Sequence, residues 1–284
     1  MHIIDLFRTI RFPYMIFYGL GLLAGDRSST GQAAGWVNIF LVTLSFAFFW
    51  SSCYLLNDIC DQSSDIENDL NRPLAKGRAT RKQFFSLFTV TSFFGFFTSR
   101  FLESTISILL LLCWILGVLY SLPRIGLKRL PILSLVPSAT AFGLLVFIGS
   151  YLREGPSDTT ISISAIVMAL ILLAGNAKDL GDVAGDSATG RLTLPMLIGP
   201  RATAWMTVVA SSVVGIFAIR SYLVLELGQC FLLLSSMGVF TLVVGSLVLV
   251  RLKSPRPPSV RRRNLIQSFG AMLVIIAYIV GCPQ

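Results

Sequence analysis

Long apolar runs with few or no charged residues follow one another along most of this chain. Several approach the roughly 20 residues that an α-helix needs to cross a lipid bilayer. The runs are Phe12–Ala24, Leu41–Leu56, Phe84–Phe101, Ile106–Leu122, Ile132–Tyr151, Ile161–Ala174, Ala202–Ala218, Phe231–Val250 and Leu265–Val280. Only helices and closed barrels can span lipid, because every backbone polar group needs a hydrogen-bond partner within the protein. The sequence therefore predicts an all-α, polytopic membrane bundle of about nine transmembrane helices.

The composition excludes an ordinary soluble domain. Hydrophobic residues make up 54% of the 284 residues and charged residues only 13%, whereas a soluble domain carries charge on roughly a quarter of its residues. The first residues lack a basic segment followed by an apolar run and a small-residue cleavage site, so we expect no cleaved signal peptide. The five cysteines have no C-x-x-C spacing, so we expect neither a disulfide framework nor a zinc site.

The basic residues predict an orientation in the membrane. With nine spans, the N-terminus and the loops after the even-numbered spans hold 19 of the 23 lysines and arginines. Short loops rich in Lys and Arg mark the cytoplasmic side, so this side is predicted to be cytoplasmic. The net charge of +9 has the same explanation, aided by attraction to anionic lipid headgroups. A nucleic-acid partner is therefore not expected.

Two acidic clusters share one spacing, and each acid of the second lies 121 residues after its counterpart in the first. The first cluster is Asp58, Asp61 and Asp65, and the second is Asp179, Asp182 and Asp186. Positions i, i+3 and i+7 share one face of a helix, and both clusters fall on the predicted cytoplasmic side. The offset predicts a single transmembrane domain, residues 1–284, with pseudo-repeated four-helix halves at approximately 1–122 and 123–250 and a ninth helix closing the bundle.

Acidic faces that meet need cations between them. Mg²⁺ takes oxygen ligands and usually bridges a few carboxylates to substrate phosphates. Basic residues lie close by: Arg72 after the first cluster, Lys178 beside the second, and Lys128-Arg129 in the loop between. Arginine can hold a phosphate bidentately and lysine acts as a point charge. The acids could instead only solvate loops, but the duplicated spacing favours a pair of metal-binding arms that hold a diphosphate.

The clusters resemble the two signature motifs of the UbiA superfamily of intramembrane prenyltransferases. From Asn57 the chain reads N-D-x-x-D-x-x-x-D-x-x-N-x-x-x-R-P, and from Lys178 it reads K-D-x-x-D-V-x-G-D-x-x-x-G-x-x-T-L-P. Tyr120 and the Lys128-Arg129 loop resemble the segment between the family's fourth and fifth helices. The resemblance spans nearly the whole chain, and the second motif is most similar to the chlorophyll, homogentisate and archaeal glyceryl-ether branch.

The resemblance implies nine helices around a cavity in which a magnesium-bound prenyl diphosphate ionises. The allylic group then passes to an aromatic or other nucleophilic acceptor. The implied metal ligands are Asp58, Asp61 and Asp65 for one ion and Asp182 and Asp186 for the other, with Asp179 matching the pattern. The implied substrate contacts are Asn57 beside the first ion, Arg72, Lys128 and Lys178 on the diphosphate, Asn68 as a hydrogen-bonding group, and Tyr120 on the prenyl chain or diphosphate.

The first helix departs from the family pattern, and the departure keeps a second activity open. Many members carry Arg-Pro-x-Asn or a similar polar residue there, as part of the acceptor pocket. Here Tyr14, a candidate substrate contact that would shape the cavity around the prenyl chain, lies in the run Phe12–Phe17, which contains no Asn. An apolar first helix fits a terpene cyclase, in which a double bond of the same prenyl chain captures the cation. The second motif favours the transferase, and the donor length and acceptor stay open.

Two further expectations concern the cavity and a rival class. Aromatic rings could line the cavity and stabilise an allylic cation through their faces, or they could face lipid and neighbouring helices. The candidates are Phe46, Phe48, Phe49, Trp50, Phe84, Phe85, Phe94 and Phe97. A membrane transporter also has repeated halves and charged residues within the membrane. Acids at helix ends beside Arg and Lys fit phosphate binding better than the mid-span acids of a carrier.

Overall fold

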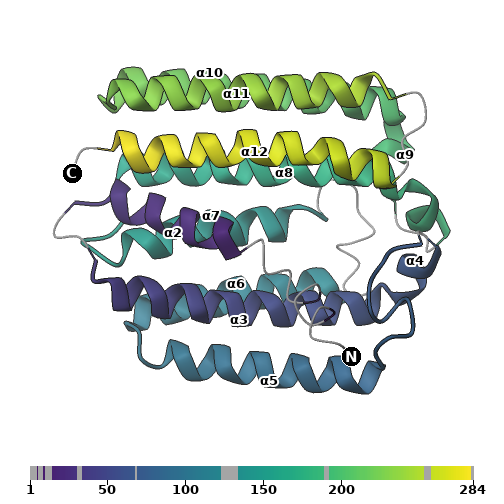
Figure 1. Ribbon diagram of the computed structural model, residues 1–284. Coiled ribbons are helices and arrows are strands. Elements are labelled where there is room, and N and C mark those ends of the chain that lie inside the picture. The colour runs from purple at the N-terminus through teal and green to yellow at the C-terminus, as the bar shows by residue number, and fades with distance from the viewer. Residues whose placement is uncertain are drawn as a thin grey trace.

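The computed structural model describes residues 5, 9, 15–30, 34–67, 69–122, 134–188, 192–252 and 257–282. In these residues all regular structure is helical and no strand is present, which confirms the predicted all-α class. The helices are α2 (Met15–Ser28), α3 (Trp36–Cys60), α4 (Gln62–Glu67), α5 (Arg81–Ser99), α6 (Ser104–Ser121), α7 (Val136–Ser150), α8 (Asp158–Ala188), α9 (Leu194–Ile198), α10 (Pro200–Val224), α11 (Gln229–Val250) and α12 (Pro257–Gly281). Figure 1 shows the long helices lying along one common direction.

Six of the described helices are long and apolar enough to cross a membrane, namely α3, α6, α8, α10, α11 and α12. Helix α7 is apolar but has only 15 residues. Helices α2 and α5 lie in the first and third predicted spans. The chain is therefore a multi-pass membrane bundle, while the number of nine spans stays a prediction.

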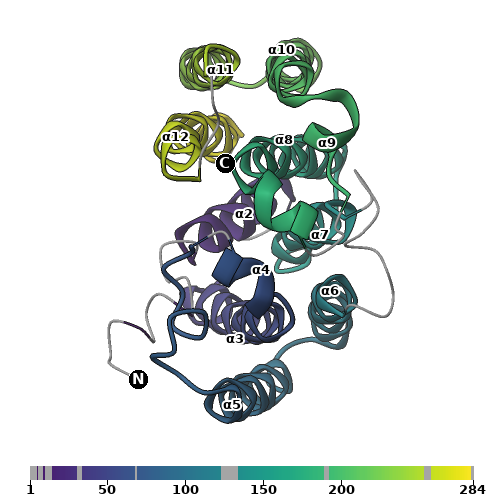
Figure 2. The ribbon, with the colours of Figure 1, turned by 90° about the vertical axis from the view of Figure 1, so that its right-hand side faces the viewer.

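The outer faces of the bundle are apolar, as contact with lipid requires. Phe93 on α5, Ile216 on α10 and Phe240 on α11 are 62%, 66% and 70% exposed. Figure 2 shows these three helices at the two ends of an elongated cross-section. Soluble monomers rarely expose apolar patches of such extent. These faces are therefore the lipid-contacting surface.

The centre of the bundle is held by close helix contacts. Helices α2, α7 and α8 lie between the outer groups (Figure 2), and the largest buried core joins them to α3. A Cβ atom added at Gly25 of α2 would lie 1.9 Å from the carbonyl oxygen of Val146 on α7. Only glycine fits there, and small residues of this kind let membrane helices approach closely. Helices α2 and α7 are thus held in close contact at the centre of the bundle.

The starting residues of the helices form two series along the chain. Helices α2, α3, α5 and α6 begin at Met15, Trp36, Arg81 and Ser104, and α7, α8, α10 and α11 begin at Val136, Asp158, Pro200 and Gln229. The two series are offset by close to the 121 residues that separate the acidic clusters. Helix α12 follows as the closing helix. The division at residues 122 and 123 stays a prediction, because order along the chain does not show that the halves superpose in space.

The two acidic clusters differ in local structure. Helix α8 continues to Ala188, beyond the predicted end of its span at Ala174, and carries all three acids of the second cluster. Helix α3 ends at Cys60, and Asp61 caps it in a non-helical conformation (φ −97°, ψ 9°) before α4 begins. The prediction of one continuous helix face therefore holds for the second cluster. The first cluster is divided between two helices that meet at Asp61.

Candidate active site

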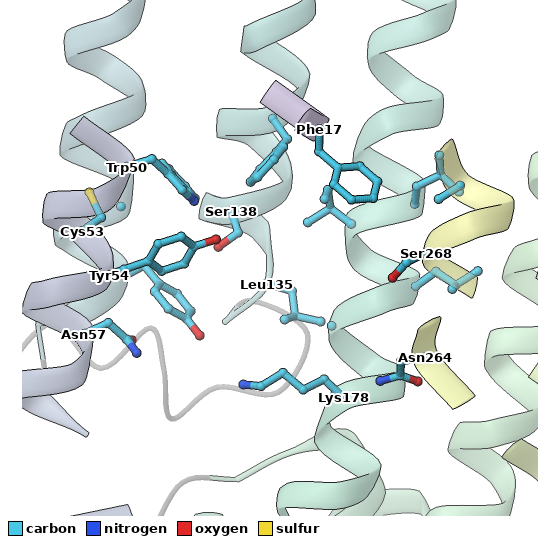
Figure 3. Close-up of a pocket in the computed structure, with 18 of the residues that line it drawn as sticks. Phe17, Trp50, Cys53, Tyr54, Asn57, Leu135, Ser138, Lys178, Asn264 and Ser268 are labelled. Atoms are coloured by element: carbon cyan, nitrogen blue, oxygen red, sulfur yellow. The ribbon is translucent and has the colours of Figure 1, made fainter. Parts of the chain in front are cut away.

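A cavity of about 640 Å³ opens among α2, α3, α6, α7, α8 and α12. Figure 3 shows Phe17 and Trp50 toward one end of it and Asn57, Lys178 and Asn264 toward the other. We call these the apolar end and the polar end. The cavity therefore matches a molecule with a charged head and a hydrocarbon tail.

The first acidic cluster is positioned where α3 gives way to α4. The backbone N–H of Asp61 donates to the carbonyl oxygen of Asn57 at 2.8 Å, and that of Asp65 donates to the carbonyl oxygen of Asp61 at 2.9 Å. These bonds hold α4 directly beyond the end of α3. Asp58 and Asp65 are buried, at 3% and 5% exposure. Two carboxylates are thus held out of water where α3 meets α4.

Arg72 joins these two carboxylates. Its Nη1 atom donates to Asp58 Oδ1 at 2.9 Å and to Asp65 Oδ2 at 2.5 Å. Burial raises the pKa of Asp65 to about 6, the nearby carboxylates of Asp58 and Asp61 also raise it, and the Arg72 guanidinium lowers it. The cluster therefore concentrates negative charge that needs a cation, and Arg72 supplies one positive charge.

All three acids of the second cluster lie on α8, and Asp179 lines the cavity. Asp179, Asp182 and Asp186 are buried, at 3%, 6% and 3% exposure. Lys178 Nζ lies 3.4 Å from Asp182 Oδ2, and the lysine side chain is about half exposed. Helix α4 packs against α8, and in Figure 1 it lies at the end of the bundle where the chain passes from α8 to α9. The fold therefore brings the two clusters to one end, on elements in contact.

The candidate residues occupy different positions relative to the cavity. Those that line it are Asn57, Asp58, Asp61, Arg72, Tyr120, Lys178 and Asp179. Asp65 on α4 and the pair Asp182 and Asp186 on α8 are buried but do not line it. Tyr14, Asn68 and Lys128 lie outside the described residues. The structure thus places most of the candidates at one end of the bundle, and the role of every candidate stays a prediction.

The chemistry of this end fits a divalent metal, although the described side chains do not form a closed coordination sphere. In the described part of the chain no group of three or more His, Cys, Asp or Glu residues is arranged to hold an ion. Arg72 lies between two of the carboxylates. Asn57 Oδ1 is buried and accepts no hydrogen bond from any described residue. The carboxylates and the Asn57 amide both offer oxygen ligands, which Mg²⁺ prefers.

Several residues that line the cavity lie outside the two sequence motifs. Of the eight aromatic candidates only Trp50 lines the cavity; Phe85, Phe94 and Phe97 are exposed on the outer face of α5. Tyr54 lies one helical turn before Asp58, so its position on the same face was a usable signal. Asn264 and Gln267 on α12 also line the cavity. Gln267 is an amide within the apolar run Leu265–Val280, and Asn264 directly precedes that run, so both offered a usable signal.

Comparison with known proteins adds a family, two relatives and a fold. The profile of the UbiA prenyltransferase family matches residues 15–273. The chain is 22% identical over 254 residues to the digeranylgeranylglyceryl phosphate synthase of Methanobrevibacter smithii, covering 86% of this chain and 87% of the relative. It is 27% identical over 182 residues to the fumagillin beta-trans-bergamotene synthase of Aspergillus fumigatus, covering 61% of this chain and 62% of the relative.

A solved structure shares the fold. The structure of a UbiA homologue from Archaeoglobus fulgidus, bound to GPP and Mg²⁺, aligns with a TM-score of 0.70 at 16% sequence identity. The alignment covers 96% of this chain and 99% of that homologue. At this level of identity, the likeness shows that the two chains have the same arrangement of helices.

Proposed function

The chain belongs to the UbiA prenyltransferase family, and on this basis we propose a magnesium-dependent enzyme of the membrane that ionises an allylic prenyl diphosphate and transfers the prenyl group to an acceptor. One observation carries the proposal: buried carboxylates, an arginine and a lysine gather at one end of a cavity whose other end is apolar. A prenyl diphosphate has the same division into charged head and hydrocarbon tail. The GPP and Mg²⁺ bound by the structural relative support this substrate class.

The two acidic clusters are the proposed metal ligands. We assign one Mg²⁺ to Asp58, Asp61 and Asp65, and a second to Asp182 and Asp186 with Asp179 beside them. Bound Mg²⁺ neutralises the charge that develops on a departing phosphate oxygen. Arg72 bridges two carboxylates of the first cluster, and the pKa of Asp65 is raised. Both observations indicate that this cluster is stabilised by nearby positive charge, which supports the assignment of a metal ion.

The basic residues are assigned to the diphosphate. A guanidinium has five N–H donors, so Arg72 can contact its two carboxylates and phosphate oxygens together. Lys178 lines the cavity, and its half-exposed side chain can reach toward a phosphate as a point charge. Lys128 and Asn68 are proposed for the same anion from their motif positions. Asn57 offers its buried amide oxygen to the first ion or its water.

The rest of the cavity is assigned to the prenyl chain. Trp50 and Phe142 pack edge to face with ring centroids 5.4 Å apart, and both line the cavity. Tyr54 packs edge to face against Trp50 at 6.1 Å. Such rings exclude water from a reactive cation and attract its charge to their faces. Tyr120 lies where it can contact the chain or the diphosphate.

A terpene cyclase is the second candidate. The aromatic lining of the cavity and the likeness to the bergamotene synthase of Aspergillus fumigatus favour it. The transferase stays first because polar side chains outside the two motifs, on α7 and α12, also line the cavity. A cyclase cavity instead excludes water and needs no polar side chains to orient an acceptor. A transporter is disfavoured by the family and by acids grouped at one end of the bundle.

The orientation is proposed from charge. Both acidic clusters lie at one end of the bundle (Figure 1), and the basic residues concentrate in the loops assigned to that end. The positive-inside rule then favours a cytoplasmic face for both clusters and for the N-terminus. The remaining apolar surface contacts the lipid bilayer. No nucleic-acid partner is proposed.

The test uses the purified full-length chain with geranyl, farnesyl and geranylgeranyl diphosphates. Each donor is incubated with Mg²⁺ or with excess chelator, and released diphosphate and organic products are measured. We expect Mg²⁺-dependent release of diphosphate from at least one donor. A cyclic hydrocarbon or terpene alcohol formed efficiently from a single donor would place the cyclase first. No Mg²⁺-dependent release from any donor would refute both activities.

A further inference from the structure

Residues 69–80 join α4 to α5 and carry Arg72; we call this segment the α4–α5 loop. Asn71, Arg72 and Pro73 line the cavity. The later part of the loop is fixed by apolar packing, because Leu74 and Ala79 are buried against residues of α3 and α5. Asn71 is exposed, so its side chain is not held in this way. A polar contact is therefore needed to fix it.

Arg78 connects Asn71 to the N-terminal segment of the chain. Its Nη2 atom donates to Asn71 Oδ1 at 2.9 Å, and its Nε atom donates to Asp5 Oδ1 at 3.1 Å. The backbone N–H of Arg78 also donates to the carbonyl oxygen of Pro73 at 2.8 Å. Asp5 precedes Arg78 by 73 residues. A single side chain thus joins the neighbour of Arg72 to a distant part of the chain.

The contact with Asp5 differs from the other ion pair of the loop. The Asp5 side chain is 5% exposed and the Arg78 side chain is 33% exposed. Lys76 pairs with Asp69, whose side chain is 88% exposed, and exposed pairs contribute little to stability. A buried carboxylate is costly unless a partner compensates its charge. Asp5 therefore anchors Arg78, whereas Lys76 and Asp69 form only a surface contact.

The geometry of Arg78 suits it to act on the site from outside. Neither Asp5 nor Arg78 is among the residues that line the cavity, so both act on it through Asn71 and Arg72. A planar guanidinium can make the two contacts at once, whereas lysine offers one point charge on a flexible stem. Misplacement of a catalytic group by about 1 Å can cost about a hundredfold in rate. The contacts of Arg78 are therefore positioned to control how Arg72 meets a diphosphate.

On the premise of the proposed function, we infer that Arg78 is a positioning residue for diphosphate binding and that Asp5 is its anchor. The two side-chain contacts of Arg78 hold Asn71, and with it the adjoining Arg72, in place at the polar end of the cavity. Neither Asp5 nor Arg78 touches the substrate, and no proton or bond of the reaction involves them. The pair acts on the diphosphate alone, so binding of the prenyl chain does not depend on it.

The experiment measures diphosphate binding and chain binding separately on the purified full-length chain. The diphosphate probe is inorganic diphosphate with Mg²⁺, and its Kd is measured by isothermal titration calorimetry. The chain probe is geranylgeraniol, which has a prenyl chain but no phosphate. Its binding is measured as a rise in unfolding temperature, because a ligand that binds the native state stabilises it. The KM and kcat of the donor that the chain uses best are measured alongside.

Arg78→Lys is the decisive variant, because it keeps a positive charge beside Asp5 but cannot contact Asp5 and Asn71 together. Its unfolding temperature should stay within about 2 °C of the wild-type value. The Kd of inorganic diphosphate and the KM of the donor should both rise roughly threefold to tenfold, the value of one hydrogen bond. The kcat of the donor and the stabilisation by geranylgeraniol should stay close to their wild-type values.

Two further variants test the contact itself. Asn71→Leu removes the acceptor of the Arg78 contact and should raise the Kd of inorganic diphosphate by the same factor. The double variant with Arg78→Lys should bind no more weakly than either single variant, because both substitutions remove one shared contact. Lys76→Gln is the matched control, since it removes a positive charge from the same loop without touching Arg78. Its Kd should equal that of wild type.

Wild-type affinity for inorganic diphosphate in Arg78→Lys would overturn the inference. An equal loss of geranylgeraniol binding would also overturn it, because that result indicates a structural role. So would fully additive effects in the double variant, which would mean that Asn71 acts without Arg78. If wild type still releases diphosphate from a donor with Mg²⁺, only the positioning role fails in these cases. Without such release from any donor, the proposed function itself fails.

Discussion

Replacing Arg72 by glutamine tests how the first acidic cluster is stabilised. One nitrogen of Arg72 serves both Asp58 and Asp65, at 2.9 and 2.5 Å, and both carboxylates are buried. Removing one partner of a buried ion pair typically costs about 3–5 kcal/mol, because the remaining charge is left uncompensated. The Arg72 side chain is 17% exposed, so water relieves part of the penalty. We therefore expect the lower limit, about 3 kcal/mol, in the absence of divalent metal.

The loss should shrink when Mg²⁺ is added, because the proposed metal supplies the missing positive charge. Thermal unfolding of the purified protein in detergent, followed by tryptophan fluorescence, measures both states. With about 2 °C or more per kcal/mol for a chain of this size, Arg72→Gln should unfold roughly 6 °C below wild type in chelator. In saturating Mg²⁺ the gap should fall to less than half of that value.

Arg81→Gln is the matched control for this comparison. Arg81 lies near the same cluster but is exposed, and it donates to Gln62 Oε1 and to the Ile59 carbonyl oxygen. Its removal deletes the same charge without opening a buried pair, so Tm should change by about 2 °C or less. Equal stability of Arg72→Gln and wild type in chelator would refute the bridge as a stabilising contact. Equal effects of Mg²⁺ on all three proteins would refute the metal site at this cluster.

Three further predictions concern other parts of the molecule. Asp182→Asn keeps the side-chain shape but removes a proposed ligand, so kcat at saturating Mg²⁺ should fall at least about a hundredfold; a fall of less than threefold would contradict its role. Asp26 and Arg153 form a buried pair with two contacts of 2.9 Å, so Asp26→Asn should destabilise by about 3 kcal/mol in thermal unfolding while the donor KM stays the same. Ser63→Cys and Ser187→Cys, made in a chain without native cysteines, should react with a membrane-impermeant reagent from the cytoplasmic side only. Labelling of the two cysteines from opposite sides of the membrane would contradict the predicted topology.

The architecture was largely predictable, because lipid imposes a simple rule on sequence. Uncharged runs of the right length must be helices, and the observed α3, α10 and α11 cover the runs around Leu41–Leu56, Ala202–Ala218 and Phe231–Val250. The end of α8 was not predictable in this way. By composition, the acids of the second cluster look like loop residues. In the structure they are buried, and the part of α8 that carries them packs against α4, so the helix continues beyond the apolar run.

Only the part of the site that lies within sequence motifs could be predicted. Spacing identified the acidic clusters, Arg72 and Lys178, and the structure brings these to one end of the bundle. The bridge from Arg72 to two carboxylates depends on how the segment after α4 folds back, which spacing does not encode. The cavity-lining amides of α12 were missed for a related reason. Asn264 and Gln267 lie far along the chain from either motif, and only the packing of α12 against α8 brings them to the cavity.

Ionisation of an allylic bond is the central claim, and one matched pair of substrates tests it most directly. The purified chain is given the donor that it uses best and the 2,3-dihydro analogue of that donor, each with Mg²⁺ and with chelator. The analogue binds through the same diphosphate and nearly the same chain, but its carbon cannot form an allylic cation. We predict Mg²⁺-dependent diphosphate release from the allylic donor and at least a thousandfold slower release from the analogue, since the cation loses more than about 4 kcal/mol of stabilisation. Comparable release from both, or release that persists in chelator, would contradict ionisation at this site.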